Sequence, residues 1–257
     1  MPTVSIVKCD DYDVEKVYHA IHKSLRLING IDKLVRPGMK VLLKLNLLSS
    51  SQPPESAINT HPSVARALVN IFQRDFGCEV SIGDSSGSVK NASTFNAFKL
   101  TRINEIAEDT KAKIVNFDKD EYIDVHNRDY EVLEKFRIAK TLRTVDFIVS
   151  VPKLKTHGLT QYTGAIKNMM GTIPGNGKKN VHLIAPKPTV FAKALVDIFQ
   201  MSPPHLIVMD AIVGMEGNGP IQGKAKYCGV LVCGDDLVAV DATAARLMKI
   251  EPLKVKY

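Results

Sequence analysis

The 257-residue sequence contains no tryptophan, and aromatic residues make up only 6% of it. The core is therefore expected to consist mainly of aliphatic side chains. No apolar run approaches the roughly 18 residues that a membrane-spanning helix needs. The first residues also lack the charged segment and long apolar segment of a secretory signal. We therefore expect a cytoplasmic protein that has no membrane partner.

The chain has four cysteines, and no two of them form a Cys-x-x-Cys pair. This spacing excludes the usual zinc-ribbon and ferredoxin patterns. Few and irregularly spaced cysteines are typical of a reducing compartment. An iron–sulfur protein built on these scattered residues is kept as an alternative, because Cys228 and Cys233 could lie near each other. Against it, the two flank a predicted strand and could simply be buried. The four residues are Cys9, Cys78, Cys228 and Cys233.

Several signatures of nucleotide and metal sites are also missing. Neither the phosphate-binding loop Gly-x-x-x-x-Gly-Lys-Ser/Thr nor the dinucleotide fingerprint Gly-x-Gly-x-x-Gly occurs. There is no His-x-x-x-His pair and no dense group of acidic residues, so no metal ligand is predicted.

Positive charge is in excess, with 34 Lys and Arg against 27 Asp and Glu and a formal net charge of +7. Such an excess suits an anionic partner. The lysines are scattered, without a dense basic run or interleaved aromatic residues, so a small anionic ligand is favoured over nucleic acid. A non-catalytic module that binds nucleic acid or a protein partner remains the alternative. The sequence does not indicate the oligomeric state.

Strand-like and helix-like segments alternate along the chain, which predicts an α/β fold with a mainly parallel sheet, helices on both faces and three layers. The continuous apolar character of residues 40–46 is typical of a parallel strand covered on both faces. No linker is long enough to separate two domains. We expect a single domain over residues 1–257, with a less regular excursion at about residues 86–144 and loops at 172–180 and 214–220.

Ligands of open α/β sheets bind beyond the carboxyl ends of the strands, and polar residues stand at several predicted strand ends. We expect these residues to converge on one crevice. The ligand-binding candidates at the first two strand ends are Lys44, Asn46, Asp84 and Ser85.

The central stretch follows the apolar run at residues 147–151. Alternation along a strand places Lys153, Lys155 and His157 on one side. Two ammonium groups and an imidazole suit phosphate or carboxylate, and a lysine with a lowered pKa can act as a base. Lys167 and Asn168, on a helix-like segment, are further ligand candidates. The structural alternative for all of them is an ordinary solvated surface.

Two glycine-rich segments follow. Residues 172–180 can form a lid, and His182 beyond them can act as a general acid or metal ligand. In the second segment, Gly217, Asn218 and Gly219 can offer backbone N–H groups to an anion, and Glu216 can transfer protons. A flexible loop and a tight connection are the structural alternatives. The catalytic candidates are Lys155, His157, His182 and Glu216.

The run PKLKTHG at residues 152–158, with TGAIKN at 163–168 and Gly171, resembles the core motif of the domain-of-unknown-function 362 family. Members are often labelled uncharacterised iron–sulfur centre proteins. The other motifs of that family are expected where this chain has KLN at 44–46, THP at 60–62, GD at 83–84, EGNGP at 216–220 and AVDA at 239–242. The general layout is also distantly similar to the nickel-dependent lactate racemase group.

The resemblance implies a redox role in which a separate ferredoxin delivers electrons. Two departures bear on it. Lys44-Leu45-Asn46 replaces the usual Lys-Pro-Asn, which keeps the polar pair, and the ferredoxin-like Cys-x-x-Cys-x-x-Cys runs are absent. An iron–sulfur cofactor is thus implied by the family label but is not supported by the cysteine spacing. We predict an enzyme that binds a small anionic molecule at the carboxyl edge of the sheet.

Overall fold

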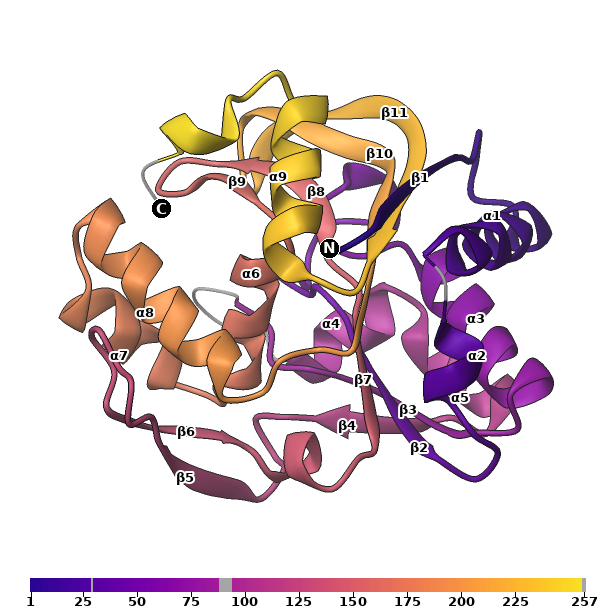
Figure 1. Cartoon of the computed structure of the whole chain (residues 1–257), viewed down its shortest axis with the longest axis horizontal. Helices are drawn as coiled ribbons and strands as arrows, with labels where there is room; N and C mark the ends of the chain where they lie inside the picture. The colour runs from indigo at the N-terminus through magenta and orange to yellow at the C-terminus, as the bar shows by residue number, and fades with distance from the viewer. Residues whose placement is uncertain (29, 88–93, 256–257) are drawn as a thin grey trace.

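A large, mostly parallel β-sheet runs through the computed structural model, which describes residues 1–28, 30–87 and 94–255 (Figure 1). Its strand order is β1-β11-β10-β7-β2-β3-β4, and β8 and β9 extend it beside β10. The strands from β10 to β4 are parallel, whereas β1, β11 and β9 join antiparallel. The predicted α/β class with a mainly parallel sheet is confirmed.

The strands are β1 Val4–Lys8, β2 Lys40–Lys44, β3 Glu79–Asp84, β4 Lys113–Asn116, β5 Tyr122–His126, β6 Lys135–Ala139, β7 Phe147–Ser150, β8 Lys153–His157, β9 Gln161–Thr163, β10 Leu206–Asn218 and β11 Gln222–Gly234. The helices are α1 Val14–Leu27, α2 Ile31–Leu34, α3 Pro62–Asn70, α4 Thr94–Leu100, α5 Ile103–Thr110, α6 Ala165–Asn168, α7 Gly177–Ile184, α8 Pro188–Gln200 and α9 Leu237–Leu247.

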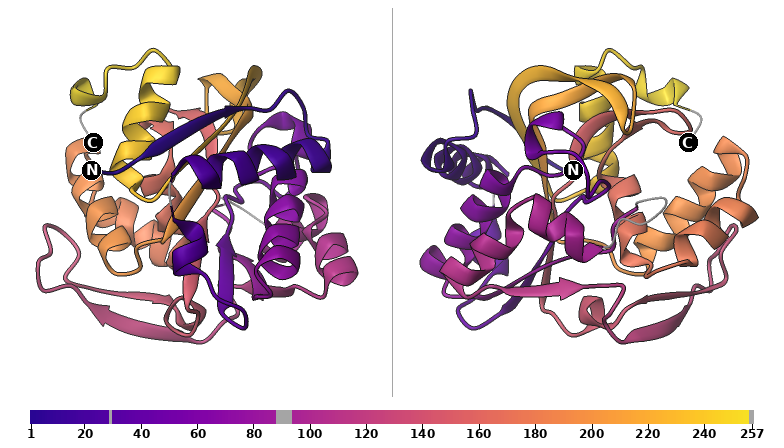
Figure 2. Two further views of the ribbon diagram at one scale, coloured as in Figure 1. Left: turned by 45° about the vertical axis from the view of Figure 1, so that its right-hand side comes forward. Right: turned by 180° about the vertical axis from the view of Figure 1, so that it is seen from behind.

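Helices lie on both sides of the sheet (Figure 2). On one face, α1, α3 and α5 pack over an aliphatic core that includes Val17, Ile21 and Leu68. On the other face, α9 and α6 cover β10 and β11. The part of that face around β2 and β4 is covered instead by the separate β5–β6 hairpin, which packs against Leu42 and Phe117.

The excursion predicted at about residues 86–144 is partly integrated into the sheet. Residues 94–112 form α4 and α5, with the predicted break near Leu100, and β4 then pairs with β3. The predicted edge hairpin is β5–β6. Residues 88–93 of this range lie outside the described residues. A single domain over the whole chain stays a prediction.

Two predicted loops contain regular structure. β10 runs on to Asn218, and its glycine-rich end pairs with β11 as far as Gln222. Its glycines and exposed polar residues hide the alternation that marks a strand. α7 begins at Gly177, inside the predicted lid, and its first turns bury only Val181, so it lacks a clear apolar stripe. None of the helices in the described part of the chain has the length and apolarity that a bilayer crossing requires.

Candidate functional site

A pocket opens to solvent where β2 and β3 end, beside β8 and α6. Three of the predicted strand ends converge here, as expected for parallel strands that end at one edge of a sheet. The predicted residues that line it are Lys44, Asn46, Asp84, Ser85, Lys155, His157, Lys167 and Asn168.

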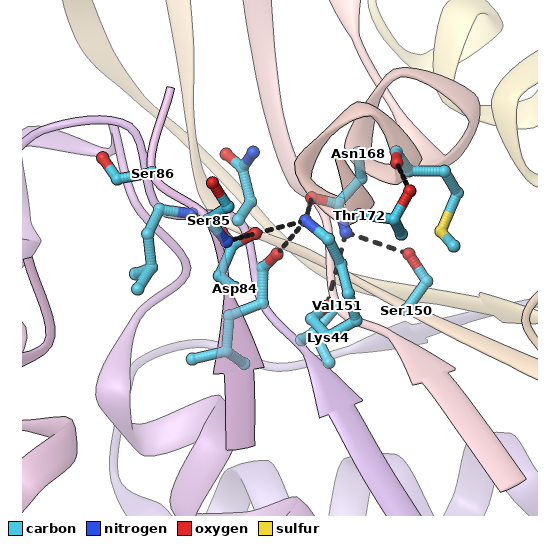
Figure 3. A network of polar contacts seen from close by, with 12 residues as sticks. Lys44, Asp84, Ser85, Ser86, Ser150, Val151, Asn168 and Thr172 are labelled. Atoms are coloured by element: carbon cyan, nitrogen blue, oxygen red, sulfur yellow. Dashed lines mark hydrogen bonds and ion pairs between the residues drawn. The ribbon is translucent and has the colours of Figure 1, made fainter. Parts of the chain in front are cut away.

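A buried ion pair forms the floor of the pocket (Figure 3). Nζ of Lys44 lies 2.6 Å from Oδ1 of Asp84 and also donates to the carbonyl of Leu45 at 2.8 Å and to Oδ1 of Asn168 at 3.2 Å. Burial lowers the pKa of Lys44 and raises the pKa of Asp84, while their mutual attraction opposes both shifts. Each charge is thus compensated by the other, which leaves neither of them for a ligand.

The same network fixes the parts of the pocket to one another. The backbone N–H groups of Leu47 and Ser85 donate to Asp84 at 2.6 and 2.9 Å. Nδ2 of Asn168 donates to Oγ of Ser150 at 2.9 Å, which ties α6 to the end of β7. Asn168 and Asp84 therefore hold the walls in place around the site.

Gly171 allows the ion pair to form, because a Cβ atom at this position would overlap Nζ of Lys44 and Oδ1 of Asp84. Gly171→Ala is expected to lower the free energy of unfolding by about 1–3 kcal/mol, the usual cost of overpacking a well-filled site. Urea titration measures this loss. Gly158→Ala is the matched control, since its nearest neighbour would be the Gly219 carbonyl at 4.0 Å. Equal free energies of unfolding of the two variants would contradict the view that Gly171 leaves room for the Lys44–Asp84 ion pair.

Lys155 is a fully buried lysine in the wall of the pocket. Its side chain is 1% exposed, and Nζ donates to the carbonyl of Ile58 at 2.5 Å without an acidic partner among the described residues. Burial, followed by the nearby charges of Lys167 and Lys153, lowers the pKa of Lys155 well below its ordinary value. A neutral amine of this kind can accept a proton or attack a carbonyl.

Lys167 reaches the pocket from α6 and is half-buried. Its Nζ lies 5.6 Å from the centre of the Phe191 ring and makes no hydrogen bond or ion pair with any residue that the structure describes. Burial and the charge of Lys44 lower the pKa of Lys167 to about 8. This lysine therefore titrates close to neutral pH and is free to hold an anion.

His157 presents one nitrogen to a ligand. Its Nδ1 accepts the backbone N–H groups of Leu159 and Thr160 at 3.1 and 3.2 Å, so the neutral ring carries its proton on Nε2. Burial, together with Lys167 and Lys155, lowers the pKa of His157 to about 3. At neutral pH His157 is uncharged and acts as a hydrogen-bond donor from Nε2.

Lys178 also lines the pocket, although the sequence pattern does not indicate it. From α7 its Nζ donates to the carbonyl of Ser85 at 3.2 Å, to Oγ of Ser85 and to the carbonyl of Ile173 at 3.1 Å. Asp118 lies 3.9 Å away and also accepts the backbone N–H of Gly175 at 2.7 Å. The adjacent lysines at 178 and 179 are a sequence signal for such a role, but the composition of residues 172–180 predicts a loop.

Lys153 lies outside this pocket, in a buried network of its own. Its Nζ is 2.8 Å from Oδ2 of Asp210 and donates to the hydroxyl of Tyr12 at 2.8 Å. The Tyr12 hydroxyl donates in turn to Oδ1 of Asp210, and the backbone N–H of His61 donates to Oδ2 at 3.0 Å. The opposite charge and the full set of hydrogen bonds indicate a structural role.

The remaining candidates do not line the pocket. Glu216 is exposed and faces Lys226 at 3.5 Å, because β10 continues past the expected loop. Beyond it, Gly217 and Asn218 are exposed in the same hairpin, and Gly219 packs against Thr156. His182 is exposed and stacks on Phe191 at 4.6 Å, with its pKa lowered by burial and by Lys167. Their functional roles stay predictions.

The donor set for a metal centre is not assembled in the described part of the chain. No group of three or more His, Cys, Asp or Glu side chains there is arranged to hold a metal ion. The four cysteines are free, with Cys228 exposed and the other three buried. The side chains of this chain therefore do not fit a cysteine-ligated iron–sulfur cluster.

Comparisons with known proteins agree with this fold. A family model described as "Domain of unknown function (DUF362)" matches residues 41–246. The chain is 28% identical over 256 residues to the thylakoid-associated protein sll1697 of Synechocystis sp., a match that covers 98% of this chain and 76% of that protein.

Among solved structures, the chain is similar to the lactate racemase apoprotein from Thermoanaerobacterium thermosaccharolyticum, with a TM-score of 0.55 and 13% identity. The match covers 86% of this chain and 53% of the racemase chain, so this chain spans about half the length of that protein. At such low identity the likeness shows the fold alone, which bears out the predicted similarity of layout.

Proposed function

The chain belongs to the DUF362 family of domains of unknown function, and we propose that it is an enzyme. Its proposed ligand is a small anionic molecule, bearing a phosphate or a carboxylate, that binds in the pocket beside β8 and α6. One observation carries the proposal. Lys155 and Lys167 line the same pocket, and neither has an acidic partner among the described residues. Burying an ammonium group without a counter-charge is costly, and a bound anion would supply that charge.

The pocket residues suit distinct roles. Lys167 would hold the anion, and His157 would donate a hydrogen bond from Nε2. Lys155, with its lowered pKa, is the proposed base, and the proton that it accepts gives it the charge that a bound anion compensates. The family resemblance, and not the pocket itself, supports a redox-linked reaction with electrons from a separate ferredoxin.

Isothermal titration calorimetry with inorganic phosphate, sulfate and acetate at low salt tests the binding step. We expect at least one of these anions to bind, and Lys167→Met to weaken that binding by about tenfold or more, the usual effect of losing a charged hydrogen bond. Lys187→Met is the matched control, since Lys187 is exposed and outside the pocket. Absence of binding by every anion, or unchanged binding by the Lys167 variant, would overturn the proposal.

Binding should also weaken as the pH rises through about 8, because Lys167 then loses the charge that holds the anion. Sulfate is the suitable probe, since its own charge is constant over this range. The groups that face Lys167 are Lys44 on β2, Lys155 and His157 on β8, and His182 on α7.

The Lys167→Arg variant isolates this effect, because arginine keeps its charge at all these pH values. Dissociation constants for sulfate between pH 7 and pH 9.5 should rise steeply for the original protein and less steeply for the variant. Identical pH profiles would show that Lys167 is not the titrating group.

A further inference from the structure

We infer that the ligand carries two negative charges on one group, as a phosphate monoester does, and that the pocket selects dianions over monoanions. This inference rests on the proposed function, because it takes anion binding in this pocket as its premise. It narrows the ligand from anions in general to a class that inorganic and simple organic probes can distinguish.

A count of charges around the pocket leads to this class. Lys44 and Asp84 neutralise each other at 2.6 Å. Nζ of Lys178 lies 3.9 Å from Oδ1 of Asp118, and this carboxylate compensates the charge of Lys178 at the edge of the pocket. Among the described lining residues, Lys155 and Lys167 are then the cations without an acidic partner. Once Lys155 has accepted a proton, the pocket presents two positive charges that lack an acidic partner among the described residues.

A monoanion would leave this arrangement half-compensated. One carboxylate can neutralise Lys155 or Lys167. The other lysine would then remain charged without a partner, or would be neutral and add no charge attraction for the ligand. The two lysines also repel each other and the neighbouring cations Lys153 and Lys44, which raises the cost of charging both in the empty pocket. A dianion removes that cost because it attracts both lysines at once.

The uncharged lining atoms also suit a group with several oxygens. The Thr163 hydroxyl lines the pocket, is buried, and has no hydrogen-bond partner among the described residues, so it can donate to a ligand oxygen. The Nε2–H of His157 is a second neutral donor. Oδ1 of Asn46 is buried, has no partner in the part of the chain that the structure describes, and can accept from a hydroxyl on the ligand. Two cations and two neutral donors match the oxygens of a phosphate better than the two oxygens of a carboxylate.

Methyl phosphate and dimethyl phosphate are the matched probes, since they share a tetrahedral phosphorus but carry two charges and one charge near pH 7.5. Calorimetric titrations at equal ionic strength should show that the protein prefers methyl phosphate by at least about tenfold. In Lys167→Met the preference should fall to within about threefold, because one uncompensated cation is gone. Lys187→Met should keep the original preference.

The possible results distinguish the preference for dianions from anion binding as such. Equal binding of the two probes, or tighter binding of dimethyl phosphate, would overturn the inference about dianions and leave anion binding intact. Binding of neither probe, with no binding of inorganic phosphate, sulfate or acetate, would overturn the proposed function and this inference with it. A preference that survives unchanged in Lys167→Met would also overturn the charge count.

Discussion

Replacing Lys155 by methionine is expected to raise the stability of the ligand-free protein while it abolishes anion binding. The side chain is 1% exposed, and its Nζ donates to the Ile58 carbonyl and pairs with no carboxylate of residues 1–28, 30–87 and 94–255. Methionine has a similar length and no charge, so it removes the cost of keeping an amine in this site. Loss of the hydrogen bond to Ile58 offsets part of the gain, and we expect a net increase of about 1–2 kcal/mol.

The pH dependence of this gain follows from the lowered pKa of Lys155. Between the folded and unfolded pKa values the unfolded chain binds more protons, so stability rises with pH and the penalty vanishes near the ordinary lysine value of about 10.4. The advantage of Lys155→Met should therefore be largest near neutral pH and shrink towards pH 10. Melting temperatures at pH 7 and pH 9.5 measure it, with the exposed Lys224→Met as control. A variant that is less stable at pH 7 would refute this view of Lys155.

Replacing Lys153 by methionine is expected to have the opposite effect, although Lys153 is equally buried and only two residues away on β8. Asp210 is fully buried, and Lys153 at 2.8 Å is its compensating charge. Removal of one partner of a buried pair leaves the other charge uncompensated, which costs about 3–5 kcal/mol. Anion binding by the folded protein should persist, because Lys153 does not line the pocket.

Urea unfolding measures the stability of Lys153→Met, and calorimetry with inorganic phosphate measures its binding. The double variant Lys153→Met/Asp210→Asn should recover part of the lost stability, because the stranded carboxylate is gone. A loss below about 1 kcal/mol in the single variant, or loss of phosphate binding in a folded Lys153→Met protein, would contradict the structural role.

The parts of the site that could be predicted from the sequence depend on local pattern. Apolar runs identified β2, β3 and β7, and parallel strands end at the same edge of a sheet. These two patterns together predict that Lys44, Asp84 and Lys155 lie close together, and the three residues line one pocket. The same patterns also indicate Lys167, which follows β8 closely in the chain.

The other features depend on contacts between distant segments. Alternation along β8 treats Lys153 and Lys155 alike, and they differ only because Asp210 on β10 lies beside the first and not the second. Lys178 reaches Ser85, which is 93 positions away, through a helix whose pattern is weak. Glu216 lies outside the pocket because β10 continues past it. The glycines in this segment break the apolar alternation that would have indicated a strand. No local signal reveals such pairings.

We expect protonated Lys155, and not Lys153, to contact the anion in this pocket. The decisive experiment is a calorimetric titration of inorganic phosphate into the original protein, Lys155→Met and Lys153→Met under one set of conditions. The original protein and folded Lys153→Met should bind phosphate, and Lys155→Met should show no detectable binding. Equal binding by all three proteins, or binding that is lost in Lys153→Met and retained in Lys155→Met, would contradict this expectation.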